Sequence, residues 1–84
     1  MKTIRFEPNV PAELRAIDQW TALSILHAIH RYAETGAGDV RPLTGEFEGF
    51  LRLRPGDYRI FFQETIDILT IHRIRNRREA YRSA

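Results

Sequence analysis

The sequence predicts an α+β domain in which two helices pack on one face of a sheet. Apolar residues recur at three- and four-residue spacing in the first half of the chain, which indicates helices. The second half alternates apolar and polar residues with a period of two and is interrupted by turn residues, which indicates strands. Helices followed by a run of strands are typical of this class. With 84 residues, we expect one domain over residues 1–84 with a single core.

The helical part follows a short N-terminal strand. Residues 2–7 alternate and precede two prolines, of which Pro11 suits the first turn of a short helix. A second helix is expected from about Asp18, a candidate N-cap, to Thr35, with Gly36 as its C-terminal stop. Its apolar stripe consists of Ala22, Ile25, Leu26, Ile29 and Ala33, widened by Trp20, Leu23 and Tyr32.

Three strands joined by two tight turns are expected in the second half. They cover residues 48–54, 58–64 and 68–74 and form an antiparallel meander. Residues 40–45 are expected to be irregular, and residues 77–84 to form a helical turn or a tail. The N-terminal strand needs a partner, and pairing it at one edge of the meander gives a four-stranded sheet.

Composition excludes several classes of protein. A hydrophobic content of 43% with 29% charged residues is typical of a folded domain rather than a disordered one. No apolar run approaches the roughly 20 residues of a membrane helix, and the N-terminus lacks a signal-peptide core. We therefore expect a cytoplasmic protein without a membrane partner. The chain has no cysteine, and His27 and His30 have no evident third ligand, so neither a metal nor a cofactor is expected.

The basic residues are unusual in kind. Twelve of the thirteen are arginine, Lys2 being the exception, although the net charge is only +2. A genome of high GC content explains this bias without any function, because it favours arginine codons. Phosphate binding explains it as well, because the planar guanidinium pairs bidentately with phosphate oxygens.

Strand alternation predicts which side chains face away from the helices. Leu51 and Leu53 share one face and are expected to meet the helices. The residues expected on the open face are Arg52, Arg54, Arg59, Phe61 and Gln63. The alternative is that these arginines are only solvated or are paired with Asp57, Glu64 and Asp67.

The last strand is expected to turn Leu69 and Ile71 toward the helices. Continued alternation then turns His72 and Ile74 to the open face and Arg73 away from it. A β-bulge near Arg73 would change this facing.

Two stretches of the chain resemble the RelE/ParE toxin superfamily. Leu43–Phe62, which includes RLRPGDYRIFF, is similar to the family's "L-x-G…yRlRvGdYRviy" meander. Residues 71–82 end in RREAYR and are similar to its "hRReVYr" ending. The likeness covers nearly the whole chain. It implies the RelE/ParE-like fold and the toxin of a bacterial type II toxin–antitoxin system, with a cognate antitoxin protein as partner.

The resemblance leaves the target of the toxin open. In the RelE branch the toxin is an mRNA interferase, a metal-independent endoribonuclease that inhibits translation in the ribosomal A site. The 2′-hydroxyl of the mRNA attacks the adjacent phosphate, so the ribosome and mRNA are partners. In the ParE branch the same fold inhibits DNA gyrase and is not a nuclease. A third reading is a degenerate member that binds its antitoxin without catalysis.

The resemblance also implies which residues act on RNA. Arg59 matches the arginine that stabilises the scissile phosphate, and Tyr81 matches the aromatic residue that stacks on or orients the substrate. An anchoring role in the core is the alternative for Tyr81. The catalytic set that the resemblance implies is Arg52, Arg54, Arg59, Arg77 and Tyr81, and the residues expected to bind RNA are Arg73, Arg75, Arg78 and Arg82.

One position departs from the family pattern. Many members carry histidine just before the two terminal arginines, where this chain has Asn76. Asparagine cannot take a proton, so the sequence does not assign the general base. His72 lies close by, although a lone histidine in a strand is more often structural than catalytic.

Overall fold

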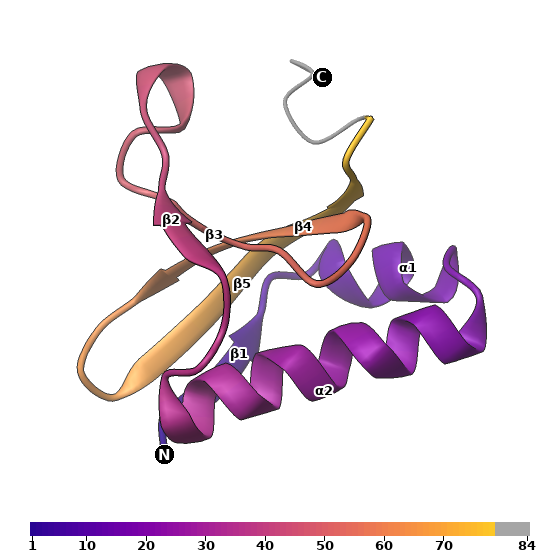
Figure 1. Cartoon of the computed structure of the whole chain (residues 1–84), viewed down its shortest axis with the longest axis horizontal. Helices are drawn as coiled ribbons and strands as arrows, with labels where there is room; N and C mark the ends of the chain where they lie inside the picture. Colours follow the sequence, from indigo (N-terminus) through magenta and orange to yellow (C-terminus); the bar gives the residue numbers. More distant parts are fainter. Residues whose placement is uncertain (79–84) are drawn as a thin grey trace.

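The computed structural model describes residues 1–78. Its sheet has the strand order β1-β5-β4-β3-β2, and both helices lie on one face of that sheet (Figure 1). The α+β class predicted from the sequence is confirmed. The elements in chain order are β1 (Thr3–Phe6), α1 (Val10–Arg15), α2 (Gln19–Thr35), β2 (Val40–Pro42), the 3-10 helix η1 (Gly45–Phe47), β3 (Leu51–Leu53), β4 (Tyr58–Glu64) and β5 (Ile68–Asn76).

The sheet has five strands, so the predicted four-stranded sheet is wrong in this detail. The extra strand is β2, which lies in a stretch expected to be irregular and pairs antiparallel with β3. Three residues are too few to show alternation, and Pro42 argues against a strand by propensity. At a sheet edge, however, proline is tolerated because the missing N–H faces away from the ladder. At the other edge β1 pairs in parallel with β5, which confirms its predicted edge position and makes the sheet mixed.

The two ends of α2 form where the local signals predict them. The Asp18 carboxylate accepts the backbone N–H of Thr21 at 3.0 Å, and the hydrogen bonds from Thr21 lower the pKa of Asp18. Gly36 takes the left-handed conformation at φ 77°, and its N–H donates to the Tyr32 carbonyl at 2.8 Å. No helix within residues 1–78 has the length and apolar character needed to cross a bilayer.

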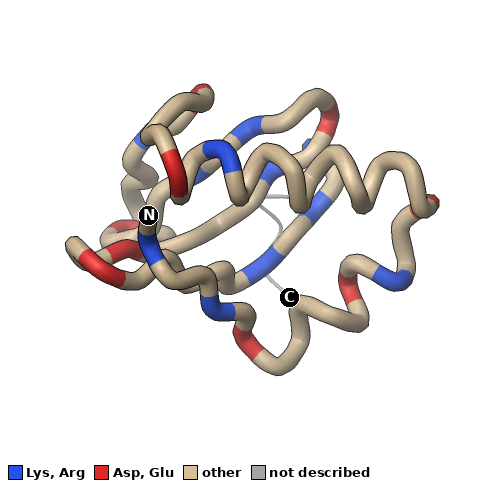
Figure 2. Tube along the Cα trace, turned by 90° about the horizontal axis from the view of Figure 1, so that it is seen from below, with Lys and Arg blue, Asp and Glu red and all other residues tan. Residues whose placement is uncertain are grey.

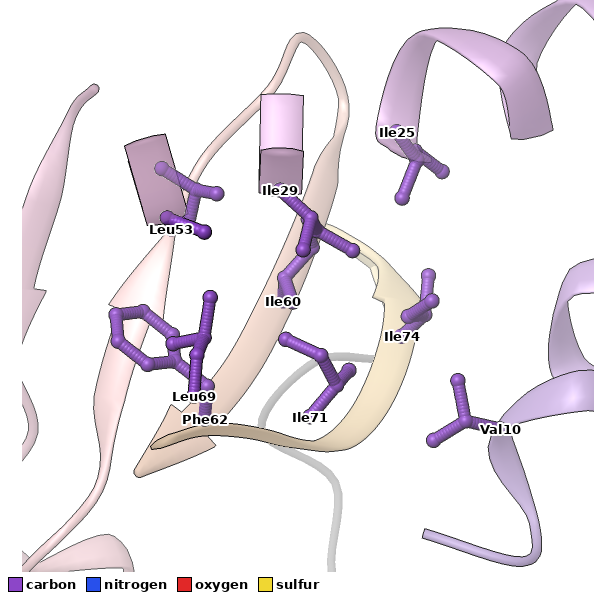
Figure 3. Packing of buried hydrophobic residues seen from close by; sticks show 10 residues of the cluster. Val10, Ile25, Ile29, Leu53, Ile60, Phe62, Leu69, Ile71 and Ile74 are labelled. Atoms are coloured by element: carbon purple, nitrogen blue, oxygen red, sulfur yellow. The ribbon is translucent and has the colours of Figure 1, made fainter. Parts of the chain in front are cut away.

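The core lies between the helices and the sheet (Figure 3). Its buried members are Val10, Ile25, Ile29, Ala33, Leu53, Ile60, Phe62, Leu69, Ile71 and Ile74. Two members of the predicted stripe on α2 are wrong, because Trp20 is 81% exposed and Leu23 is 50% exposed. At about 100° per residue, both lie on the side of α2 roughly opposite the buried Ile25.

A polar network ties the N-terminus to α2 and β4. The ammonium of Lys2 donates to the Glu64 carboxylate at 2.5 Å, and the Tyr32 hydroxyl donates to the other oxygen at 2.6 Å. Burial, together with the hydrogen bond and charge of Glu64, raises the pKa of Tyr32 to about 12. Burial also raises the pKa of Glu64, but the hydrogen bonds from Lys2 and Tyr32 outweigh it, and the net shift is downward.

This network predicts a loss of stability in acid. Because the folded state lowers the pKa of Glu64 from 4.5, the unfolded chain takes up the proton first as the pH falls. The stabilisation is therefore complete well above pH 4.5 and is lost as the pH falls below 4.5 through the lower pKa of the folded state. We expect Glu64→Gln to have a lower melting temperature than the parent at neutral pH. Its melting temperature should also fall less steeply over that acid range, and equal slopes for the two proteins would contradict the network's role.

Helix α1 covers the part of β5 that β1 leaves unpaired. β1 reaches along β5 only as far as Ile71. Beyond it, the Glu13 carboxylate accepts the backbone N–H of Ile74 at 2.7 Å, and the Asn9 amide donates to the His72 carbonyl at 3.0 Å. These side chains take the place of a strand, so the exposed edge of β5 keeps its backbone hydrogen bonds.

Candidate nucleic-acid interface

Arginine is distributed through the sheet rather than gathered on a tail. Within the strands of residues 1–78 the one acidic residue is Glu64, and the other acids lie in helices, turns and loops (Figure 2). The strands therefore form a basic framework. Each strand carries at least one arginine, and together they present Arg5, Arg41, Arg52, Arg59, Arg73 and Arg75.

A bulge in β5 changes the predicted facing of two residues. Phe61 pairs with Arg73, but the next residue, Phe62, pairs with Ile71, so His72 is an extra residue in β5. The bulge resets the alternation beyond it. Ile74 consequently enters the core, where it is 3% exposed, and Arg73 turns to the open face, so the plain alternation expected for both is wrong.

The face of the sheet away from the helices, called the open face below, has an aromatic centre flanked by arginines. Strand register places Arg52 on one side of Phe61 and Arg73 on the other. The Arg73 guanidinium lies 5.6 Å from the ring centroid of Phe61 and 5.9 Å from that of Phe47. Arg41 extends the row because it is the register partner of Arg52 on the edge strand β2.

The connection between β2 and β3 covers part of this open face. Its η1 turn rises on the side of the sheet opposite the helices (Figure 1). From η1, Phe47 packs edge-on against Phe61 with 5.2 Å between ring centroids, and Phe61 is only 2% exposed. Phe61 is therefore a buried support for Arg73 rather than an exposed stacking surface. The sequence pattern gave no signal for the part played by Phe47, which lies outside the strands.

A second pair of arginines lies two residues further along β4 and β5, and the side chain of one of them, Arg75, turns to α1 at the sheet edge. Arg59 on β4 is the register partner of Arg75 on β5. Arg59 donates to the backbone carbonyl of Tyr58 at 3.0 Å, close to the hairpin turn, whereas Arg75 pairs with Glu13 at 2.8 Å. Burial raises the pKa of Glu13, but the hydrogen bonds from Arg75 and Ile74 outweigh it and lower that pKa overall. Arg75 is thus engaged at the sheet edge, and Arg59 near the turn.

Arg54 does not lie on the open face, and its predicted facing is wrong. β3 ends at Leu53, so the alternation that assigned Arg54 no longer applies. Its guanidinium is 3.3 Å from the Asp39 carboxylate. Arg54 also lines a groove of about 300 Å³ together with His27 and Arg31 of α2, which places it on the helix side.

The C-terminal arginines lie beyond the end of β5. Arg77 is 3.9 Å from the Asp57 carboxylate, and its backbone N–H donates to the Asp57 carbonyl at 2.8 Å. Arg78 shares with it a groove of about 400 Å³ next to Tyr58. Arg77 thus follows the alternative given above for the arginines, in which they pair with nearby acids. Tyr81 and Arg82 lie outside the described residues.

His72 also faces the open face of the sheet. The His72 ring packs edge-on against the Phe50 ring, with 4.9 Å between the ring centroids, which confirms its predicted facing. Its Nδ1 lies 3.5 Å from the carboxylate of Glu7, just after β1. Sequence reasoning missed Glu7, since only the parallel pairing of β1 with β5 brings these two residues together. Within residues 1–78, no cluster of three or more potential ligands is arranged to hold a metal ion.

Sequence comparison decides the family. Residues 4–81 match the protein family described as "ParE toxin of type II toxin-antitoxin system, parDE". The chain belongs to this family. It is therefore a type II toxin of the RelE/ParE superfamily, and the resemblance drawn from its motifs is confirmed. No curated protein matches the sequence of the toxin.

Solved structures with the same fold come from several toxins. The RelBE2 toxin–antitoxin complex of Mycobacterium tuberculosis contains a chain with 19% identity and a TM-score of 0.78, covering 89% of this chain and 96% of that one. YafQ of E. coli shares 9% identity at a TM-score of 0.78, and the match covers 98% of this chain and 100% of YafQ. The RelE–RelB complex of Pyrococcus horikoshii contains a chain with 19% identity and a TM-score of 0.75, and the match covers 94% of this chain and 98% of that one. At these identities the likeness establishes the fold alone.

Proposed function

We propose that this toxin is an endoribonuclease that cleaves mRNA on the ribosome and so inhibits translation. The observation that carries the proposal is the placement of Arg52 and Arg73 on either side of Phe61 on the open face. The two guanidinium groups come from different strands of one rigid sheet, which suits them to hold a phosphate group.

The chemistry asks little of the protein because RNA carries its own nucleophile. The 2′-hydroxyl attacks the neighbouring phosphorus, the bond to the 5′-oxygen breaks, and a cyclic phosphate and a 5′-hydroxyl end remain. The negative charge that develops on the phosphate oxygens is stabilised by fixed cationic donors. Arg73 is held over Phe47 and Phe61, and Arg59 lies two residues before Phe61 on the same face of β4. We assign both to this stabilising role.

An inhibitor of DNA gyrase is the second candidate. It is favoured by the match to a family described as ParE toxin and by Asn76, which stands where many nucleases of the superfamily have histidine. In this reading the basic open face binds a protein surface rather than a phosphate.

We further propose that a cognate antitoxin protein is the partner of this toxin. The related RelE–RelB and RelBE2 structures are toxin–antitoxin complexes. An acidic, amphipathic antitoxin segment lying across a sheet edge or the helical face would cover or distort the basic surface.

Two assays with purified toxin separate the candidates. One follows cleavage of mRNA on programmed ribosomes, and the other follows DNA supercoiling by gyrase. We expect cleavage with no effect on supercoiling, and we expect Arg59→Ala to abolish cleavage without unfolding the domain. Inhibited supercoiling with intact mRNA would establish the gyrase reading, and activity in neither assay would leave an antitoxin-binding module. An Arg59→Ala variant that melts far below the parent would show that Arg59 is structural.

A further inference from the structure

We propose that His72 is the proton-transfer residue of this toxin, oriented by Glu7, and that its Nε2 takes the 2′-hydroxyl proton during mRNA cleavage. The inference rests on the proposed function and deepens it. It supplies the base that Asn76 cannot provide, because an amide does not accept a proton near neutral pH.

The bulge in β5 places this histidine beside the phosphate-binding arginine. His72 is the extra residue of the bulge, and Arg73 follows it directly. Both side chains face the open side of the sheet, where His72 packs on Phe50 and Arg73 on Phe61. Bulges often occur next to active sites, where they redirect a side chain. Here the bulge brings an imidazole and a guanidinium to adjacent positions on one face.

Glu7 orients the imidazole. The backbone N–H of Glu7 donates to the Ile71 carbonyl at 3.0 Å, which fixes Glu7 next to β5 one residue before His72. Its carboxylate lies 3.5 Å from Nδ1 of His72. An acceptor at Nδ1 favours the neutral tautomer that carries its proton there, and the lone pair then lies on Nε2. Among residues 1–78, the charged group placed against the imidazole is the Glu7 carboxylate.

The Nε2 atom of His72 makes no hydrogen bond in the described part of the fold. It is also buried. A buried polar atom of this kind is uncommon in proteins and needs an explanation. The edge-on ring of Phe50 packs against the imidazole, and Phe50 follows Gly49, whose φ of 95° is accessible mainly to glycine. Displacement of the Phe50 ring by an RNA base would open Nε2 to the 2′-hydroxyl.

Proton transfer in the proposed step needs no reactant other than water. Nε2 accepts the proton of the 2′-hydroxyl while the 2′-oxygen forms its bond to phosphorus. The bond from phosphorus to the 5′-oxygen breaks, and the departing oxygen takes a proton from water. The imidazolium then returns its proton to solvent. Arg73 stabilises the charge on the phosphate throughout.

Single-turnover cleavage of ribosome-bound mRNA tests the assignment. A positioned base contributes about 100-fold or more to such a rate, so we expect His72→Gln to lower it by about that factor. Affinity for a short single-stranded RNA should stay within about twofold, because the arginines remain. The matched control is His30→Gln on α2, where His30 is exposed and its Nδ1 lies 2.9 Å from the Leu26 carbonyl oxygen. Its rate should equal that of the parent.

Glu7→Gln provides a second variant that keeps the fold. Glu7 lies just past the end of β1, and its side chain is 40% exposed. Loss of the carboxylate charge should lower the rate by about tenfold, because the imidazole loses the group that orients it. In His72→Gln the acid limb of the pH–rate profile should disappear. Nitrogen NMR of the parent should find the neutral tautomer protonated at Nδ1.

The outcomes separate this inference from the proposed function. If the parent cleaves mRNA and His72→Gln cleaves at the same rate with the same pH profile, His72 is structural and the inference is overturned. A tautomer protonated at Nε2 would overturn it as well. If the parent cleaves no mRNA on ribosomes, the proposed function itself fails and the role of His72 falls with it.

Discussion

Arg73→Ala should abolish growth arrest by this toxin while leaving its fold intact. Removing a preorganised cationic donor from a developing oxyanion typically lowers a rate by 10²–10³-fold, and we expect a fall of about 100-fold or more in mRNA cleavage. The variant loses only a half-exposed guanidinium resting on Phe47 and Phe61, so the cost to stability should stay near 1 kcal/mol. Cleavage on programmed ribosomes and thermal unfolding measure the two effects separately.

The same variant tests whether Arg73 contacts phosphate. Each phosphate contact adds to the salt dependence of RNA binding, so the slope of log affinity against log salt should fall by about 1. Arg31→Ala is the matched control, because Arg31 is an exposed arginine on α2, on the opposite side of the sheet. It should leave both cleavage and the salt slope close to those of the parent. A salt slope unchanged by Arg73→Ala, or equal losses in both variants, would contradict a specific role for the open face.

Phe62→Ala should have the largest effect on stability. Phe62 is 1% exposed and belongs to the buried core, and its ring centroid lies 5.2 Å from that of Tyr32. Truncating a buried phenylalanine to alanine typically costs about 3–5 kcal/mol, because it removes apolar burial and leaves a cavity. A domain of this size has a total stability of only about 4–13 kcal/mol at the usual value per residue. A large fraction of the variant should therefore be unfolded near 37 °C.

Chemical denaturation with a matched control measures this cost. Phe6→Ala removes the same atoms from β1, where Phe6 is 38% exposed, and it should cost about 1 kcal/mol or less. If the two variants lost similar amounts, the face of β4 that carries Phe62 would not be the core face.

The sequence alone was sufficient for features that depend on local chemistry. The start and end of α2 follow from Asp18 and Gly36, which satisfy backbone groups only a few residues away. The helix stripe identified Ile25 and Ile29 as core residues because helical spacing is regular. Alternation likewise assigned Phe61 to the open face, since β4 pairs without a register shift up to that point.

The remaining features depend on contacts between distant parts of the chain. The bulge at His72 exists only because β4 and β5 pair with a shifted register, and alternation within β5 carries no sign of it. The approach of Glu7 to His72 requires parallel pairing between the first and last strands. The facing of Arg54 failed because β3 ends one residue earlier than its sequence pattern. For the candidate site, the sequence therefore indicated the arginines but not their arrangement.

Cleavage of mRNA on the ribosome is tested by mapping mRNA 5′ ends at nucleotide resolution in bacterial cells after induction of the toxin, with Arg73→Ala induced in parallel. Cleavage on the ribosome predicts new 5′-hydroxyl ends inside translated codons and in frame with them, and these ends should be absent when Arg73→Ala is induced. Growth arrest with no new mRNA ends would contradict the proposed endoribonuclease activity and would direct attention to gyrase as the target.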